Sequence, residues 1–158
     1  MDWIDACACA VLSILAVYDL RQRRLPNAAV AAYAALYFVQ AWHTGATRIA
    51  LESHLASGAG ALVFAALLFR LGWLGGGDAK LFAAVFLWTG PSQAGAVFFV
   101  ISLSGLMLAL VQLAYGRLRP EPPAPAWLAP ARGVPYGVAL AAGAMAALWL
   151  PSIHARLT

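Results

Sequence analysis

The sequence predicts an all-α fold: a polytopic membrane protein with six transmembrane helices and both termini outside, on the periplasmic side. Of its 158 residues, 63% are hydrophobic and only 10% are charged, whereas a typical soluble domain carries roughly 25% charged residues. Apolar runs recur along the whole chain, and a helix needs about 20 apolar residues to cross a bilayer. The runs lack the alternation expected of outer-membrane barrel strands. We therefore expect residues 1–158 to form a single integral-membrane domain.

The first three apolar runs cover about residues 3–18, 28–42 and 55–73. The segment DLRQRRLPN follows the first run, and a loop with Thr44, Arg48 and Glu52 follows the second. Three glycines, at residues 75–77, follow the third run. Secretory signal peptides begin with positive charge, whereas Asp2 and Asp5 precede the first run. The first run is therefore interpreted as a membrane helix rather than a signal peptide.

The next three runs cover about residues 79–89, 94–115 and 136–153. Gly90 and Pro91 stop the fourth run, because glycine and proline interrupt helices. The proline-rich segment RLRPEPPAPAWLAPARGVP follows the fifth run and predicts extended backbone. The stretch GVPYG, residues 133–137, predicts a turn at the start of the last run.

Charge and aromatic residues orient this arrangement. Eight of the ten basic residues fall on one side of the six runs, namely Arg21, Arg23, Arg24, Arg70, Lys80, Arg117, Arg119 and Arg132. The positive-inside rule makes that side cytoplasmic, so both termini are expected outside. Aromatic residues lie near the ends of the runs, as an interfacial belt requires. They are Trp3, Tyr18, Trp42, Trp73, Trp88, Tyr115, Tyr136 and Trp149.

The fourth run is too short for an ordinary crossing. A helix from Asp78 to Thr89 rises only about 18 Å, whereas the hydrocarbon core is about 30 Å thick. If this helix reaches the outer face, Asp78 must start below the cytoplasmic surface. Irregular glycine backbone at that depth is tolerated only where protein or a water-filled cavity surrounds it. The sequence thus indicates a hydrated pocket that opens to the cytoplasm.

Asp19 and Asp78 are the candidate catalytic residues. Ionisable residues within membrane segments are costly and are functional candidates by default, and both aspartates fall at the cytoplasmic side. Two carboxylates a few ångströms apart cannot both ionise, so one can take a proton from water while the other donates one. Two simpler interpretations stand beside this one. Asp19 begins an arginine-rich loop, where a solvated charge is common, and Asp78 is placed to cap a helix.

Other polar residues favour structural roles. Lys80 suits an interfacial anchor, and a functional role is the alternative. Cys7 and Cys9 face different sides of a helix, which favours packing over a metal or a disulfide. The three histidines, His43, His54 and His154, lack metal-ligand spacing. Ser102 and Ser104 have no histidine within a run to act as a base. No metal site and no cofactor are expected.

Two motifs carry a family resemblance. DLRQRRLPN follows the first run and GGGDAKL precedes the fourth. An aspartate seven residues before Pro-Asn, combined with G-x-G-D-x-K in six predicted spans, resembles the aspartic prepilin peptidases, the type IV leader peptidase family of G-x-G-D membrane proteases. VPYG is similar to a short motif that the family has before its last span. Leu25 stands where many members have isoleucine.

The resemblance implies a function and a location. It implies an aspartic endopeptidase of the bacterial inner (cytoplasmic) membrane that removes basic leaders from prepilin or pseudopilin precursors. Asp19 and Asp78 match the family's catalytic aspartates. Substrate or pocket-shaping roles are expected for Gly75, Gly77, Lys80, Pro26 and Asn27. Longer members carry a zinc-binding cysteine tetrad in an N-terminal region and also N-methylate pilins. The sequence resembles the short Flp/Tad-type form, so methyltransferase activity is not expected.

Expected partners are the precursor substrates, membrane lipids and a pilus or secretion assembly machinery, with no nucleic acid. Two other classes stay open. A small proton- or ion-coupled transporter also uses broken helices and intramembrane aspartates, although such transporters usually pair two interrupted halves. A catalytically silent assembly scaffold would leave both aspartates replaceable.

Overall fold

The computed structural model describes residues 2–118 and 133–157, and every secondary-structure element within them is a helix. The helices are α1 (Trp3–Gln22), α2 (Asn27–His43), α3 (Arg48–Arg70), α4 (Gly76–Leu118) and α5 (Tyr136–Leu157). The predicted all-α class is confirmed. Helices α1, α3 and α4 are long and apolar enough to cross a membrane. Most of the proline-rich segment, residues 119–132, lies outside the described residues.

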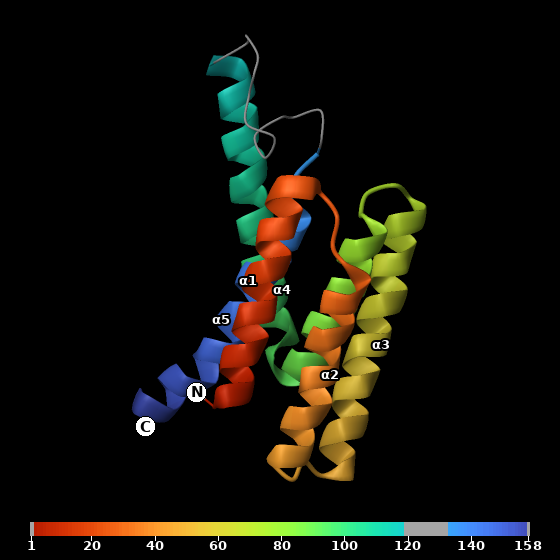
Figure 1. Ribbon diagram of the computed structural model, residues 1–158, viewed down its shortest axis with the longest axis vertical. Coiled ribbons are helices and arrows are strands. Elements are labelled where there is room, and N and C mark those ends of the chain that lie inside the picture. The colour runs from red at the N-terminus through yellow and green to blue at the C-terminus, as the bar shows by residue number, and fades with distance from the viewer. Residues whose placement is uncertain (1, 119–132, 158) are drawn as a thin grey trace.

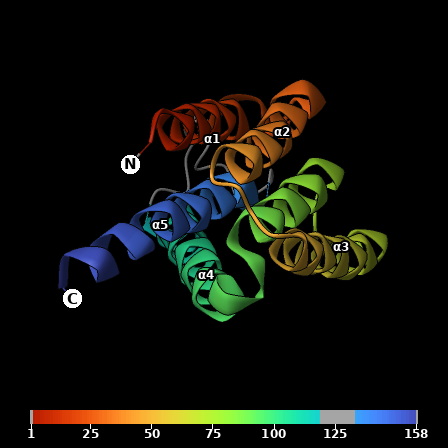
Figure 2. The ribbon, with the colours of Figure 1, turned by 90° about the horizontal axis from the view of Figure 1, so that it is seen from below.

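The chain runs up and down along one axis, so that consecutive helices lie antiparallel (Figure 1). α4 consists of two helices that are joined across a kink at Gly90, and its second half runs back in the direction opposite to its first half (Figure 1). The N- and C-terminal ends therefore lie at the same end of the molecule. α4 packs against α2, α3 and α5, and α5 lies between α1 and α4 in the view from below (Figure 2).

α1 continues further than the sequence predicts. It ends at Gln22, and Arg23 caps it in the left-handed conformation with its backbone N–H bonded to the Asp19 carbonyl at 3.0 Å. Asp19 is therefore part of the last helical turn, and the prediction that it begins a loop is wrong. Its side chain is only 5% exposed. The arginines that follow it make the segment look like a loop, but Arg21 still belongs to α1 and Arg23 caps it. Leu15 and Asp19 lie on the buried side of this helix.

α3 begins seven residues before the predicted start. The Thr47 side chain accepts a hydrogen bond from the Ala50 N–H at 3.2 Å, which satisfies one of the free N–H groups of the first turn. Arg48 and Glu52 form an exposed ion pair of 2.8 Å one turn apart. Two of the polar residues expected in this loop, Arg48 and Glu52, therefore belong to the start of α3, whereas Thr44 caps the end of α2.

A side chain of α3, His54, contacts α4 at its break. Pro91 has no N–H, so the Leu87 carbonyl loses the donor that a continuous helix would supply. His54 Nδ1 lies 2.9 Å from the Leu87 carbonyl oxygen. The His54 ring also packs against Gly90, where a Cβ would lie only 2.6 Å from Nε2. Gly90 has φ 60° and ψ −176°, which only glycine adopts readily. The predicted stop at Gly90 and Pro91 is thus present as a kink.

An aromatic cluster joins α2 to the first half of α4. Tyr33 is fully buried and stacks on Trp88, with ring centroids 5.4 Å apart. The Trp88 indole N–H donates to the Tyr33 carbonyl at 2.8 Å, and Tyr37 stacks on His54 at 5.4 Å. Trp88 therefore faces inward instead of joining an interfacial belt, whereas Trp42 and Trp73 are 89% and 77% exposed.

The first half of α4 is the buried centre of the bundle. Leu81, Phe82 and Val85 are at most 4% exposed, and large apolar side chains remain exposed along α3 and the second half of α4. Such surfaces suit contact with lipid, where exposed apolar groups cost nothing. Most of the short helix that begins near Asp78 is therefore buried against other helices.

Candidate active site

A polar cavity of about 690 Å³ lies where α1 ends and where α4 and α5 begin. Asp19 and Asp78 both line it. Their carboxyl groups are close enough to interact electrostatically, although 58 residues separate them in the sequence. The structure thus places both sequence-predicted aspartates in one pocket. Arg23, Gly75 and Tyr136 are among the other lining residues.

The start of α5 holds Asp19. Asp19 Oδ2 accepts a hydrogen bond from the Val138 N–H in the first turn of α5 at 3.3 Å. The same N–H is shared with the Pro135 carbonyl at 3.2 Å. The partial positive charge of a helix N-terminus favours a carboxylate at this position. A Cβ on Gly137 would lie 2.9 Å from Asp19 Oδ2 and 3.0 Å from its Cγ. Only glycine at position 137 therefore lets α5 approach this side chain.

Asp78 lies in the first turn of α4. A Cβ on Gly75 would lie only 2.6 Å from Asp78 Oδ2, so the carboxyl group folds back over the glycine that precedes the helix. Its second oxygen, Oδ1, is buried, and no described residue donates a hydrogen bond to it. An unpartnered oxygen beside a cavity is placed to interact with a water molecule or a substrate, and burying it without a partner costs free energy.

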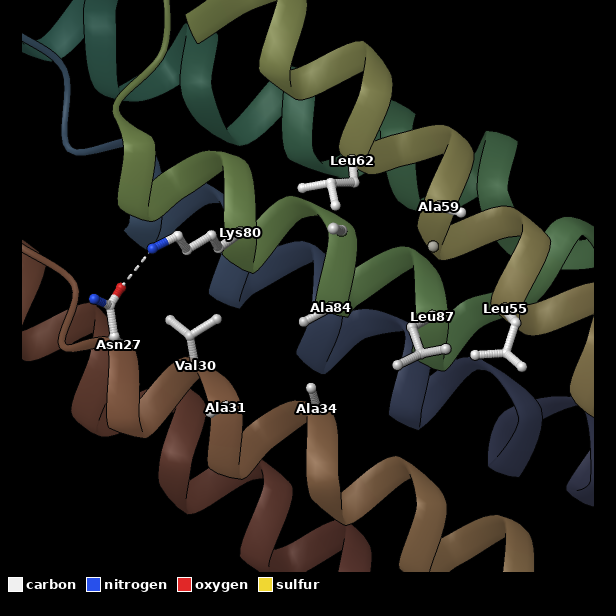
Figure 3. A pocket seen from close by; sticks show the side chains of 12 residues that line it. Asn27, Val30, Ala31, Ala34, Leu55, Ala59, Leu62, Lys80, Ala84 and Leu87 are labelled. Carbon is white, nitrogen blue, oxygen red and sulfur yellow. Dashed lines mark hydrogen bonds between the residues drawn. The ribbon is translucent and has the colours of Figure 1, made fainter.

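The LPN segment packs against the glycines but does not enter the cavity. Leu25 fills the space beside Gly77, where a Cβ would approach its side chain to 3.1 Å. Pro26 is the N-cap residue of α2 and has extended backbone. Asn27 accepts a hydrogen bond from Lys80 at 3.0 Å (Figure 3). Among the residues expected to shape the substrate pocket, Gly75 lines the aspartate cavity.

Lys80 and Asn27 instead line a separate groove between α2, α3 and α4. Successive residues of a helix are rotated by about 100°, so Asp78 and Lys80 point to nearly opposite sides of α4. The G-x-G-D-x-K motif thus serves two different surfaces of the protein.

Arg23 was not identified from the sequence as a site residue. It adopts φ 53° and ψ 35°, the only positive φ outside glycine in the described part of the chain. Its side chain lines the cavity and interacts electrostatically with both Asp19 and Asp78. Strained backbone tends to occur at functional sites. The sequence does not distinguish Arg23 from its neighbours Arg21 and Arg24. Only its position as the C-cap of α1 directs its side chain into the cavity.

Tyr136 and Gln112 hold the start of α5 against the second half of α4. The Tyr136 ring packs over Gly105, where a Cβ would lie 3.4 Å from Cε2. Gln112, a buried polar residue of α4, donates to the Gly133 carbonyl at 3.3 Å. The GVPYG stretch therefore lies beside the cavity and supplies the Tyr136 ring. Val138, the residue that follows it, supplies the backbone N–H that bonds Asp19.

The arrangement provides a paired-carboxyl site with a nearby cation, enclosed on one side by glycine backbone. Such a pair is suited to general acid–base chemistry on a peptide bond. Within residues 2–118 and 133–157, no group of three or more histidine, cysteine, aspartate or glutamate side chains is placed to hold a metal ion. The free cysteines Cys7 and Cys9 lie on α1.

Comparison with known proteins assigns the chain to a family. A model of the type IV leader peptidase family matches residues 6–110, a stretch that contains Asp19, Asp78 and both motifs. No match was found among curated proteins or among solved structures. The match covers about two thirds of the chain, and it confirms the resemblance carried by the two motifs. The chain belongs to the type IV leader peptidase family.

Proposed function

We propose that this protein removes the leader peptide of type IV pilin-like precursors by activating water between Asp19 and Asp78. Family membership supports an aspartic peptidase of the prepilin type. The observation that carries the mechanism is the meeting of the two carboxyl groups, from α1 and α4, in one polar cavity. The precursor's peptide bond enters this cavity next to the glycine backbone at Gly75.

The surroundings of the two aspartates give them different roles. Asp19 accepts a hydrogen bond from a backbone N–H at the start of α5, and this contact favours its ionised form. Arg23 lies near both carboxyl groups. Asp78 Oδ1 has no donor among the described residues, so a proton on this oxygen avoids an unpartnered buried charge. Asp19 is then the general base, and Asp78 is the general acid.

The reaction follows from these roles. Asp19 takes a proton from water as the water oxygen bonds to the carbonyl carbon, and Asp78 gives its proton to the carbonyl oxygen. The resulting tetrahedral intermediate collapses as Asp19 passes its proton to the leaving nitrogen. Asp78 recovers a proton from the hydroxyl group as the carbonyl re-forms. Arg23 offsets the negative charge of the pair throughout.

The position of the cavity fits cleavage at the cytoplasmic face of a bacterial inner membrane. It lies at the end of the bundle where the α1–α2 and α3–α4 connections meet the start of α5 (Figure 1). That end carries most of the basic residues, which favours a cytoplasmic location. Six crossings, with α4 contributing two, place both termini outside.

A cleavage assay with purified protein tests this function. The protein in detergent is incubated with a prepilin, and release of the leader is measured over time. Asp19→Asn and Asp78→Asn each lower the rate by at least about 10²-fold, because general acid–base catalysis contributes roughly 10²–10⁴-fold. Glu52→Gln removes a carboxylate from the exposed pair with Arg48 and keeps the wild-type rate.

Membrane insertion of both aspartate variants is checked by extraction and gel filtration. Cleavage at the wild-type rate by either aspartate variant contradicts the mechanism. A wild-type protein that cleaves no prepilin under any condition contradicts the function itself.

A further inference from the structure

A second pocket lies on the side of α4 opposite to the aspartates. It is an open groove of about 620 Å³ between α2, α3 and the first half of α4 (Figure 3). Its lining is almost entirely apolar and includes Val30, Ala34, Leu55, Leu62, Ala84 and Leu87. Leu55 and Leu62 remain 42% and 45% exposed, so the walls are accessible from the surroundings of the protein.

The polar atoms of the groove gather at one end. Lys80 and Asn27 lie there, and Lys80 Nζ donates to Asn27 Oδ1 at 3.0 Å (Figure 3). Asn27 is the first residue of α2 and Lys80 is the fifth residue of α4, so both lie near one end of the bundle. Among the described residues, no carboxylate forms an ion pair with Lys80. The groove therefore combines an apolar channel with an uncompensated positive charge at its mouth.

The remaining donors at this end suit a phosphate. An ammonium group has three N–H donors, and the bond to Asn27 uses one of them. Because Asn27 accepts through Oδ1, its NH₂ group keeps two more donors. Lysine ammonium groups bind phosphate as point charges, and basic pockets between membrane helices bind anionic headgroups.

The length of the groove fits an acyl chain below such a headgroup. From Lys80 to Leu87 the helix rises about 10 Å, which is about two thirds of one leaflet of a 30 Å hydrocarbon core. We propose that the groove between α2, α3 and α4 binds one anionic phospholipid, with its phosphate at Lys80 and Asn27 and an acyl chain along the apolar walls.

A membrane helix of a precursor is the competing occupant. Two observations disfavour it. Lys80 and Asp78 face opposite sides of α4, so a helix in the groove would not lead its peptide bond to the aspartates. Under the proposed function the leader is basic, and like charges at Lys80 would repel it. An anionic lipid meets neither obstacle.

Native mass spectrometry of the whole protein tests the site. The protein is reconstituted in nanodiscs of equal phosphatidylglycerol and phosphatidylcholine, and the lipid that stays bound after release is identified. The wild type retains one phosphatidylglycerol in preference to phosphatidylcholine. Lys80→Gln reduces this preference about tenfold, because a charge-assisted hydrogen bond to phosphate is lost. Arg70→Gln removes an exposed cation at the same end of the bundle and keeps the preference.

A second pair of variants tests the apolar walls. Ala59 lines the groove and is exposed, so Ala59→Phe fills the groove without disturbing the core and abolishes lipid retention. Val63→Phe adds similar bulk at a position on α3 that is 63% exposed and lies outside the lining, and it leaves retention unchanged.

Three outcomes overturn the proposal: a wild type without lipid preference, a Lys80→Gln variant that retains phosphatidylglycerol as the wild type does, and displacement of the lipid by a prepilin added to the nanodiscs. Inorganic phosphate added at millimolar concentration does not displace the bound lipid, since the acyl chain contributes to binding. None of these readouts depends on peptidase activity.

Discussion

Arg23 has a backbone conformation that is costly for an arginine. The left-handed region costs a residue with a side chain roughly 1–2 kcal/mol, and φ is 53° here. The conformation ends α1 and turns the chain towards Pro26, and it leaves the Arg23 side chain in the cavity with both aspartates. The strained backbone thus holds a cation beside the proposed catalytic pair.

Removal of the Arg23 charge should slow cleavage. Asparagine tolerates the left-handed conformation, so Arg23→Asn preserves the turn while it removes the cation that favours one ionised carboxylate. We expect the cleavage rate to fall about tenfold or more, because the general base then lacks electrostatic support. Arg24→Asn, at the exposed neighbouring position, serves as the control. Equal rates for the two variants would show that Arg23 has no part in catalysis.

Gly137 tests the contact between α5 and Asp19. A methyl group on residue 137 meets three atoms of the Asp19 side chain at 2.9–3.1 Å, which forces the carboxyl group away from its bond to Val138. Gly137→Ala should therefore lower the cleavage rate at least about 10²-fold, as expected when a general base is misplaced. In Gly60→Ala the new methyl group meets no atom within 4 Å. That variant should keep full activity and gain roughly 0.5–1 kcal/mol of helix stability.

For single residues, the sequence alone identifies charged side chains that lie within or next to apolar segments. Asp19 and Asp78 are carboxylates in an apolar chain, so composition alone draws attention to them. The partners of these residues are not visible in the same way. Val138 contributes only a backbone N–H to Asp19, and any residue except proline offers that group. A partner of this kind becomes apparent only when α5 is placed against α1.

The kink in α4 turns one apolar segment into two antiparallel helices. Three features act together there: the positive φ of Gly90, the missing N–H of Pro91 and the His54 ring that bonds the freed Leu87 carbonyl. The short first half can then lie at the centre of the bundle, with Asp78 at its start. The kink thus determines where the first half of α4 lies, and with it the position of Asp78, one member of the proposed catalytic pair.

Loss of His54 should destabilise the kink. His54→Leu leaves the buried Leu87 carbonyl without its side-chain donor, and an unsatisfied buried acceptor costs about 1–3 kcal/mol. We expect a lower midpoint of thermal unfolding in detergent, measured by circular dichroism. His43→Leu, at an exposed position in the last turn of α2, should leave the midpoint unchanged. A His54→Leu midpoint equal to that of the wild type would remove this explanation of the kink.

Helices are predicted well where apolar runs are long and less well at their ends. The starts of α2 and α5 fall within one residue of their predicted positions, because Pro26 and Pro135 mark them. The predicted start of α3 is wrong, because Arg48 and Glu52 resemble loop residues in sequence, whereas an ion pair and the Thr47 cap hold them in the helix. End positions that depend on side-chain hydrogen bonds cannot be read from hydropathy.

The whole molecule places its polar site and its termini at opposite ends. The aspartate cavity lies at one end of the bundle, while the N- and C-terminal ends of the chain lie at the other (Figure 1). Charge orients such a bundle, because basic residues stay on the cytoplasmic side. Substrate therefore reaches the cavity from the cytoplasm under the proposed topology.

Labelling of intact cells checks this orientation. In a Cys7→Ala/Cys9→Ala background, Ala46→Cys lies in the exposed α2–α3 connection and Leu71→Cys lies in the α3–α4 connection. A membrane-impermeant thiol reagent should label Ala46→Cys from outside, and it should label Leu71→Cys only after the cells are lysed. The reverse pattern would mean that the bundle is inverted and that the cavity faces outward.

A double-mutant cycle on the two aspartates tests the central claim most directly. The cleavage rate is measured for Asp19→Asn, Asp78→Asn and the double variant with the same prepilin in detergent. If the two carboxyl groups act as one unit, each single variant loses nearly all of the activity, and the double variant loses no more than either single variant. Losses that multiply in the double variant, or a single variant with the wild-type rate, would contradict a shared catalytic pair.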